Sequence, residues 1–138
     1  MIYINSSCSF FTPDLLKQLV HVFQSIYPIR IRSMHLSCLS MEDMYEFNKK
    51  ALNHEYYTDV ITFCDKKKNF LDIEMYLSLD YVKRYCEGKD VSLSREYIRT
   101  FYHGLLHCIG YTDSLPEEKD QMRIRENELC NEYFKSST

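Results

Sequence analysis

The sequence contains no tryptophan and only three glycines and three prolines among 138 residues. So few glycines and prolines, without any low-complexity tract, argue against a disordered chain and against a long linker. No apolar run approaches the roughly 20 residues that a membrane-spanning helix needs, and the first residues, MIYINSSCSF, do not form a basic-then-apolar signal segment. We therefore expect one domain over residues 1–138, located in the cytoplasm and not bound to a membrane.

A surplus of basic residues is also missing. The chain has 17 Lys and Arg against 20 Asp and Glu, which gives a net charge of −3. Nucleic-acid binders usually carry a basic surplus, so any RNA-binding surface here must be a local groove on one face. Lys66–Lys68 and the pair Arg30 and Arg32 are candidates, although such short basic runs are usually solvated loops.

The six cysteines are scattered singly, and no C-x-x-C pair is present. A disulfide framework usually accompanies secretion, for which the sequence has no signal. We therefore expect six reduced thiols, most of them small residues of the core.

The predicted elements indicate an α+β fold, in which a small mixed β-sheet packs with helices. Strands are predicted at 1–5, 29–39, 59–63 and 70–79, the last two forming a hairpin. Helices are predicted from Pro13 to Ile26, from Ser40 through Phe47, over 80–87, after Ser94 and from Pro116, with 49–58 as a loop.

The helix after Ser94 carries two histidines on its polar face. Its apolar residues recur in pairs at helical spacing, which indicates a stripe that faces the core. These pairs are 97/98, 101/102, 105/106 and 108/109. His103 and His107 project to the opposite side, one turn apart, so both imidazoles can point at the same spot.

Two of the three glycines belong to this segment. Gly104 lies in mid-helix, where glycine costs about 1 kcal/mol relative to alanine. Its presence indicates that another part of the molecule approaches the backbone there, or that a side chain would obstruct a site. Gly110 is suited to end the helix in a left-handed conformation, and the resulting reversal can bring Asp113 alongside the two imidazoles.

Two imidazole nitrogens and one carboxylate oxygen are the protein ligands of a catalytic zinc site, which keeps its fourth position open for water. Cys108 is expected to face the core and is a poor fourth ligand. The residues predict one zinc ion per chain, held by His103, His107 and Asp113. The spacing matches the zinc-protease pattern H-E-x-x-H-x-x-G-x-x-H, but Gly104 stands where the protease has its general base.

The segment HGLLHCIGYTD (103–113) resembles the H-G-x-L-H-x-x-G-Y-x-H/D signature of the YbeY family, bacterial zinc-dependent endoribonucleases that process ribosomal RNA. The resemblance continues in TDVITF (58–63), which is similar to T-D-V-L-S-F, and in LDIEMYLS (71–78), which is similar to G-D-I-x-I-S. REY (95–97) stands where the family often has R-E, and DQMRIRENEL (120–129) resembles its M-R-x-x-E pattern.

The resemblance implies a zincin-like histidine helix whose zinc ligands are His103, His107 and Asp113. It also implies a single-strand-specific endoribonuclease that acts in 16S rRNA 3'-end maturation and ribosome quality control. Its partners would be ribosomal RNA, the small ribosomal subunit and associated proteins. Asp113 stands where the family often has histidine, and its charge should weaken the acidification of bound water and raise the pH optimum.

The chain departs from the family pattern in the loop before T-D-V. The family usually has L-N-x-x-Y-R there, with an arginine thought to contact substrate. Here Leu52–Tyr56 continues through Tyr57 directly into Thr58, so the arginine is missing and the loop is shorter. Arg99, one turn before His103, can substitute for it.

Other residues near this loop offer further contacts. Lys49 and Lys50 are alternative substitutes for the missing arginine, and His54, Tyr56 and Tyr57 are candidates to stack on unpaired bases. The family's G-D-I is also changed, because Leu71 replaces its glycine.

Three hypotheses remain open at this point. The first is the zinc endoribonuclease. The second is a zinc hydrolase of another substrate such as an amide, against which Gly104 argues. The third is a catalytically weak or inactive ribosome-assembly factor that keeps the metal site, which the missing arginine favours.

Overall fold

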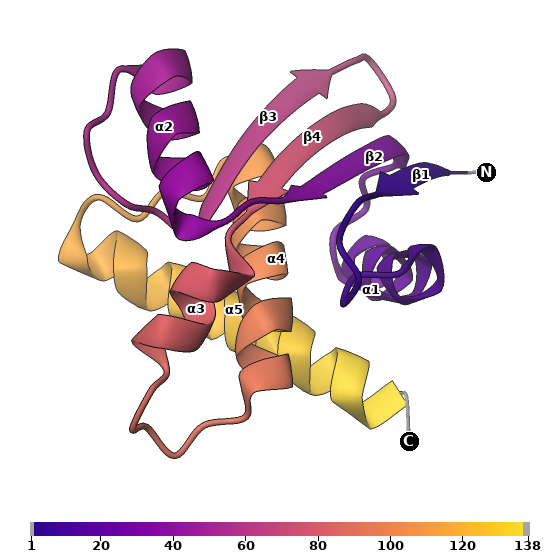
Figure 1. The fold of residues 1–138 in the computed structure, drawn as a ribbon. Coiled ribbons are helices and arrows are strands. Elements are labelled where there is room, and N and C mark those ends of the chain that lie inside the picture. Colours follow the sequence, from indigo (N-terminus) through magenta and orange to yellow (C-terminus); the bar gives the residue numbers. More distant parts are fainter. Residues whose placement is uncertain (1, 137–138) are drawn as a thin grey trace.

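A four-stranded mixed sheet forms the frame of the structure, a computed structural model that describes residues 2–136 (Figure 1). The strands are β1 (Tyr3–Ser6), β2 (Ile31–Cys38), β3 (Val60–Lys66) and β4 (Leu71–Leu77). Their order is β1-β2-β4-β3, in which β1, β2 and β4 are parallel and β3 runs antiparallel to β4. The predicted α+β class, mixed sheet and hairpin are confirmed. Met1, in the predicted first strand, lies outside the described residues.

Five helices accompany the sheet in the described part of the chain. They are α1 (Pro13–Ile26), α2 (Met41–Leu52), α3 (Leu79–Tyr85), α4 (Leu93–Cys108) and α5 (Pro116–Ser136). The first two begin where the sequence predicts, because the Thr12 side chain accepts a hydrogen bond from the Leu15 N–H and the Ser40 side chain accepts one from the Asp43 N–H. Within residues 2–136, none of the helices combines the length and the apolar character that crossing a membrane requires.

Several element boundaries differ from the prediction: α3 covers Leu79–Tyr85 and not 80–87, β3 extends to Lys66 and not only to residue 63, and α2 and α4 differ as follows. Residues 49–52, predicted as part of a loop, continue α2, and Asn53 ends that helix in a left-handed conformation with φ +56°. Lys49 and Lys50 favour this last turn because cations there complement the helix dipole. Helix α4 begins after Ser92 instead of Ser94, since the Ser92 side chain accepts a hydrogen bond from the Arg95 N–H.

The core lies between one face of the sheet and the helices α1, α4 and α5, which Figure 1 shows on the same side of it. Its largest fully buried side chains include Phe11, Phe23, Phe101, Tyr102, Met34, Leu36, Ile73 and Met75. Helix α2 packs on the other face of the sheet, where the ring of Phe47 lies 4.4 Å from that of Tyr76 on β4. The predicted apolar stripe of α4 is buried against this core.

Helix α4 approaches the sheet very closely at Gly104. A Cβ atom built there would lie 2.7 Å from Met75 Cε, 2.9 Å from Thr62 Oγ1 and 3.2 Å from Val60 Cγ2. The expected close approach to the backbone of Gly104 is confirmed, and the approaching elements are β3 and β4. The glycine therefore fixes how deeply α4, and with it both histidines, sits on the sheet.

Four of the six cysteines form disulfides, so the expectation of six reduced thiols is wrong for these four. One bond joins Cys8, after β1, to Cys38 at the end of β2, and the other joins Cys64 on β3 to Cys108, the last residue of α4. Partners 30 and 44 residues apart meet only through sheet pairing and through the packing of α4 on β3. No local spacing signals such contacts. The remaining thiols are Cys86 and Cys130.

Candidate metal centre

His103 and His107 project from α4, and the turn after this helix brings Asp113 to them. Gly110 has φ +104°, its N–H bonds to the carbonyl of His107 at 3.2 Å, and the Tyr111 N–H bonds to the carbonyl of Leu106 at 3.1 Å. This pair of bonds is a Schellman motif, which reverses the chain after a helix. The predicted left-handed Gly110 and the return of Asp113 are both confirmed.

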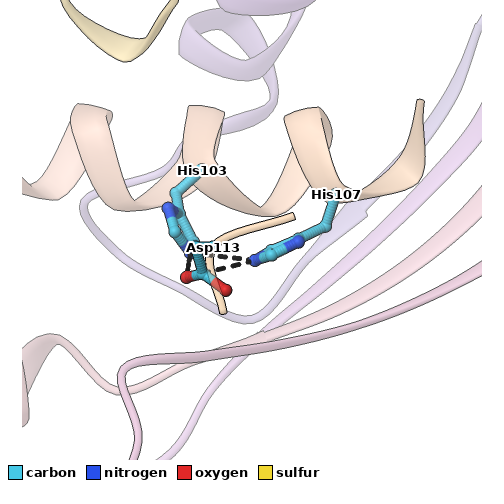
Figure 2. A group of neighbouring side chains, drawn as sticks. All are labelled: His103, His107 and Asp113. Atoms are coloured by element: carbon cyan, nitrogen blue, oxygen red, sulfur yellow. Dashed lines mark hydrogen bonds and ion pairs between the residues drawn. The ribbon is translucent and has the colours of Figure 1, made fainter. Parts of the chain in front are cut away.

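Figure 2 shows the two imidazoles and the Asp113 carboxylate pointing toward one another. The Nε2 atoms of His103 and His107 are 3.0 Å apart. Asp113 Oδ2 lies 3.2 Å from Nε2 of His103 and 3.7 Å from Nε2 of His107. The three side chains are therefore close enough to hold one metal ion, as the sequence predicts.

The second nitrogen of each imidazole faces a hydrogen-bond acceptor. His103 Nδ1 lies 2.5 Å from Glu126 Oε2, and His107 Nδ1 lies 2.9 Å from the carbonyl oxygen of Tyr111. Because a carbonyl only accepts, Nδ1 of His107 must carry the proton, and the carboxylate favours the same tautomer of His103. Both Nε2 atoms then direct lone pairs at the same point, as metal-binding histidines do.

This donor set fits a divalent metal ion. Two lone pairs and a carboxylate oxygen that face one another within about 3–4 Å repel unless a cation or proton lies between them. Ligand atoms about 2.1 Å from a tetrahedral zinc ion are about 3.4 Å apart, which lies within the spread of the three distances. The residues present therefore suit Zn²⁺, with the side toward the solvent open to further ligands.

Glu126 is buried, and its side chain anchors the centre from α5. Its second oxygen lies 3.6 Å from the guanidinium of Arg99, whose Nε in turn lies 3.1 Å from Glu96. Burial alone would lower the pKa of His103, but the hydrogen bond and charge of Glu126, with the nearby charges of Asp59 and Asp113, raise the pKa above its ordinary value. Glu126 thus orients the imidazole and makes it a stronger base.

Glu118 fixes the loop that carries Asp113. Its Oε2 accepts a hydrogen bond of 2.6 Å from the Thr112 hydroxyl, and its Oε1 accepts bonds from the N–H groups of Ser114 and Leu115 at 3.1 and 2.9 Å. Leu115 directly precedes α5, and Glu118 is the third residue of this helix. A glutamate at this third position that bonds back to the residue before the helix forms the second half of a capping box. The start of α5 and the position of Asp113 therefore depend on the same carboxylate.

A cleft of about 320 Å³ opens beside His103 and Asp113. Four carboxylates and three cationic side chains line it: Asp59, Asp113, Asp120 and Glu126, with Arg99, Lys119 and Arg123. The cleft is thus mixed in charge and not evenly acidic. Burial raises the pKa of Asp59, although the charge of His103 opposes this shift.

The other residues considered from the sequence lie in different places. Arg99 lines the cleft but is largely buried and engaged by Glu96 and Glu126, whereas Lys49 and Lys50 are not among the residues of its wall. Sequence reasoning assigned no role to Glu126, Glu118 or Asp59. Glu126 is the glutamate of the segment that resembles M-R-x-x-E, and Asp59 is the aspartate of the segment that resembles T-D-V. Their places in these motifs could have indicated a role. Glu118 had a local signal, its capping-box spacing from Leu115.

The chain is similar to known proteins over most of its length. The model of the endoribonuclease YbeY family matches residues 7–134. The chain is 34% identical to the endoribonuclease YbeY of Bacteroides fragilis over 119 residues, 83% of this chain and 86% of that protein. It is 33% identical to the endoribonuclease YbeY of Phocaeicola vulgatus over 101 residues, 73% of each chain.

The fold has a counterpart among solved structures. The solution structure of TM1509 from Thermotoga maritima superposes with a TM-score of 0.66, covering 99% of this chain and 91% of that one at 20% identity. This likeness concerns the fold alone. The family is assigned by the match of the family model over residues 7–134 and by the identity to its members: the chain belongs to the YbeY family of endoribonucleases.

Proposed function

We propose that this protein is a zinc-dependent endoribonuclease that cleaves single-stranded RNA. The observation that carries the proposal is the convergence of His103 Nε2, His107 Nε2 and Asp113 Oδ2 beside a cleft, in a chain of an endoribonuclease family. We further propose the small ribosomal subunit as its partner in the cytoplasm, with roles in 16S rRNA 3'-end maturation and ribosome quality control.

His103, His107 and Asp113 would hold one Zn²⁺. A bound zinc ion supplies Lewis-acid activation of water and of a phosphate oxygen. Glu126 keeps the proton of His103 on Nδ1, and the carbonyl of Tyr111 does the same for His107, so both Nε2 atoms stay available. Arg99 acts through Glu126, whose second oxygen its guanidinium faces.

Two cationic side chains of α5 are suited to hold the phosphate that is cleaved. Lys119 and Arg123 lie one helical turn apart, are exposed, and line the cleft with Asp113. Neither side chain forms an ion pair with any residue between 2 and 136. They replace the arginine that is missing from the shortened loop.

Asp59 is the cleft carboxylate suited to exchange a proton with water or a leaving oxygen, because its burial raises its pKa.

Two exposed tyrosine rings lie two and three residues before Asp59 in the chain. Tyr56 and Tyr57 are 54% and 49% exposed, and the ring of His54 stacks on that of Tyr56 at 5.1 Å between centroids. Aromatic faces bind unpaired bases by stacking and tolerate different sequences. This arrangement supports single-stranded RNA as the substrate.

The proposal is tested by metal content and cleavage together. Mass spectrometry of the purified protein should find about one zinc ion per chain, lost in His107→Ala and Asp113→Ala but kept in the control His54→Ala. The zinc-loaded protein should cleave a labelled single-stranded RNA and spare its duplex. Absence of metal after zinc reconstitution would overturn the catalytic proposal.

Small subunits that contain precursor 16S rRNA test the finer claim. We expect cleavage near the 3' end by the unaltered protein and none by His107→Ala. Association with these subunits by a zinc-loaded protein that cleaves no RNA would instead identify an assembly factor.

A further inference from the structure

A second hollow, of about 570 Å³, lies at the tip of the β3–β4 hairpin and is purely cationic. Its charged wall residues are Arg30, Lys66, Lys67 and Lys68, and no carboxylate lines it. The contrast with the metal cleft, where carboxylates outnumber cations, is sharp in a chain whose net charge is −3. We refer to this hollow as the hairpin groove.

Backbone hydrogen bonds hold the groove in shape. The Lys67 N–H bonds to the Phe70 carbonyl at 2.8 Å and closes the hairpin turn, while the Leu71 N–H bonds to the Arg30 carbonyl at 2.8 Å. The N–H of Ile31 donates to the side chain of Gln24 at 2.8 Å, which ties the segment of Arg30 to α1. The cations therefore stand on a fixed frame where two separate segments meet.

Most of this charge is not neutralised by the protein. Lys66, Lys68 and Arg30 are exposed and form no ion pair with any residue in the described range 2–136. Lys67 pairs with Asp65 at 3.0 Å, and both side chains are exposed, so the solvent screens that pair. Like charges gathered in one hollow repel one another, and an anion with several negative groups would relieve this repulsion.

Strand β3 connects the groove to the metal cleft. Asp59, which lines the cleft, directly precedes the strand, and Lys66 ends it. Seven residues of strand span roughly 20 Å. Figure 1 shows the β3–β4 hairpin turn at the opposite end of β3 from the segment that joins it to α2.

We propose that the hairpin groove binds the phosphate backbone of single-stranded RNA several nucleotides from the cleavage point. The inference rests on the proposed function, because the RNA strand is what links groove and cleft. Regularly spaced phosphates match a row of cations without carboxylates, and binding of this kind is independent of base sequence. An acidic protein segment is the competing occupant, and the experiment separates the two.

The experiment measures RNA binding by fluorescence anisotropy in EDTA, so that no cleavage occurs. The probes are labelled single-stranded RNAs from about 4 to 16 nucleotides long, the range of sites on single-strand binders. The test variant carries Lys66→Gln, Lys67→Gln and Lys68→Gln. The control removes the same charge elsewhere with Lys17→Gln, Lys83→Gln and Arg84→Gln, all exposed residues outside both hollows. Thermal unfolding confirms that each variant folds.

We expect the longer RNAs to bind the test variant roughly tenfold more weakly than the unaltered protein, with the control unchanged. The slope of log affinity against log salt should fall by about 0.7 for each phosphate that the variant no longer neutralises. The loss of affinity in the test variant should grow with RNA length, because only the longer RNAs can occupy the cleft and the groove at the same time.

Equal affinities and salt slopes for test variant and unaltered protein would overturn the proposal, whatever the cleavage assay shows. Weaker binding of polyglutamate by the test variant, with RNA binding intact, would overturn it in favour of an acidic protein partner. The proposed nuclease function can fail independently of this result. In that case the protein would contain no zinc or cleave no RNA, but its RNA binding would still depend on the three lysines.

Discussion

Nδ1 of His103 lies 2.5 Å from a carboxylate oxygen of Glu126, although 23 residues separate the two in the chain. Glu126 is only 5% exposed, so the hydrogen bond is shielded from water. Helix α5 thereby sets the orientation of a side chain on α4. The candidate metal centre is consequently formed by two packed helices, and not by the histidine helix alone.

Glu126→Gln should lower zinc affinity by roughly 10- to 100-fold, the usual cost of losing a group that orients a metal-binding histidine. A neutral amide holds the Nδ1 proton of His103 less firmly than a carboxylate does. Calorimetric zinc titration measures this, with Glu128→Gln as the control, since Glu128 pairs with Arg125 on the same helix. Equal affinities in both variants would show that Glu126 is not part of the centre.

Glu118 should make stability depend on pH. The Thr112 hydroxyl and the N–H groups of Leu115 and Ser114 hold the pKa of this carboxyl below its ordinary value. A lowered folded-state pKa contributes stability above the unfolded pKa of about 4.3, and this contribution is lost as the pH falls through the folded-state pKa.

Unfolding temperatures measured against pH test this dependence. Near neutral pH the unaltered protein should unfold at a higher temperature than Glu118→Gln. At strongly acidic pH the two unfolding temperatures should become equal. The control Glu117→Gln changes a neighbouring residue, and its difference in unfolding temperature from the unaltered protein should not show this dependence on pH. A constant difference across the pH range would contradict the assignment.

Cleavage kinetics should distinguish the role of Arg123 from that of the proposed zinc ligands. Arg123→Ala should raise KM for single-stranded RNA about tenfold, the usual scale for removing a hydrogen bond to a charged phosphate. Arg123→Lys should recover part of this effect because it keeps the charge. Zinc content should stay at the level of the unaltered protein. A variant with unchanged KM would remove Arg123 from the substrate contacts.

Thiol titration distinguishes the two accounts of the cysteines. Protein that is purified and denatured without a reducing agent should show two reactive thiols, from Cys86 and Cys130. Six thiols would mean that neither disulfide forms. Replacing Cys64 and Cys108 by serine should cost about 2–4 kcal/mol of unfolding free energy. Because disulfides are rare in the cytoplasm, the count also bears on the proposed location.

Gly104→Ala should destabilise the protein although alanine favours helices. Overpacking against Met75 and Thr62 costs about 1–3 kcal/mol, and we expect this cost to exceed the gain of about 1 kcal/mol in helix propensity. Urea unfolding measures the difference. Adding Thr62→Ala, which removes the Oγ1 atom 2.9 Å from the new Cβ, should restore part of the stability. A simple gain in stability would refute the close packing.

The parts of the site that could be predicted are those fixed by local geometry. His103 and His107 are one helical turn apart, and Gly110 reverses the chain within three residues of Asp113, so their convergence follows from the sequence of one segment. The fold class followed in the same way from the order of short periodic segments.

The remaining features depend on tertiary packing, for which a single sequence offers no local pattern. Glu126 reaches His103 only because α5 packs on α4, and Cys64 meets Cys108 only because α4 lies on β3. The last turn of α2 was also missed, because its polar residues break the apolar period although a left-handed Asn53 ends the helix.

The strands under Gly104 also restrict what this helix can become. In zinc proteases the residue after the first histidine is the catalytic glutamate, but here a Cβ atom at that position would lie less than 3 Å from Thr62 Oγ1 and Met75 Cε. A glutamate side chain has no room there unless β3 moves away and the sheet edge is rebuilt. Replacing Gly104 by glutamate would therefore not place the proteases' general base beside the histidines without repacking of the sheet, although the two architectures share the same histidine spacing.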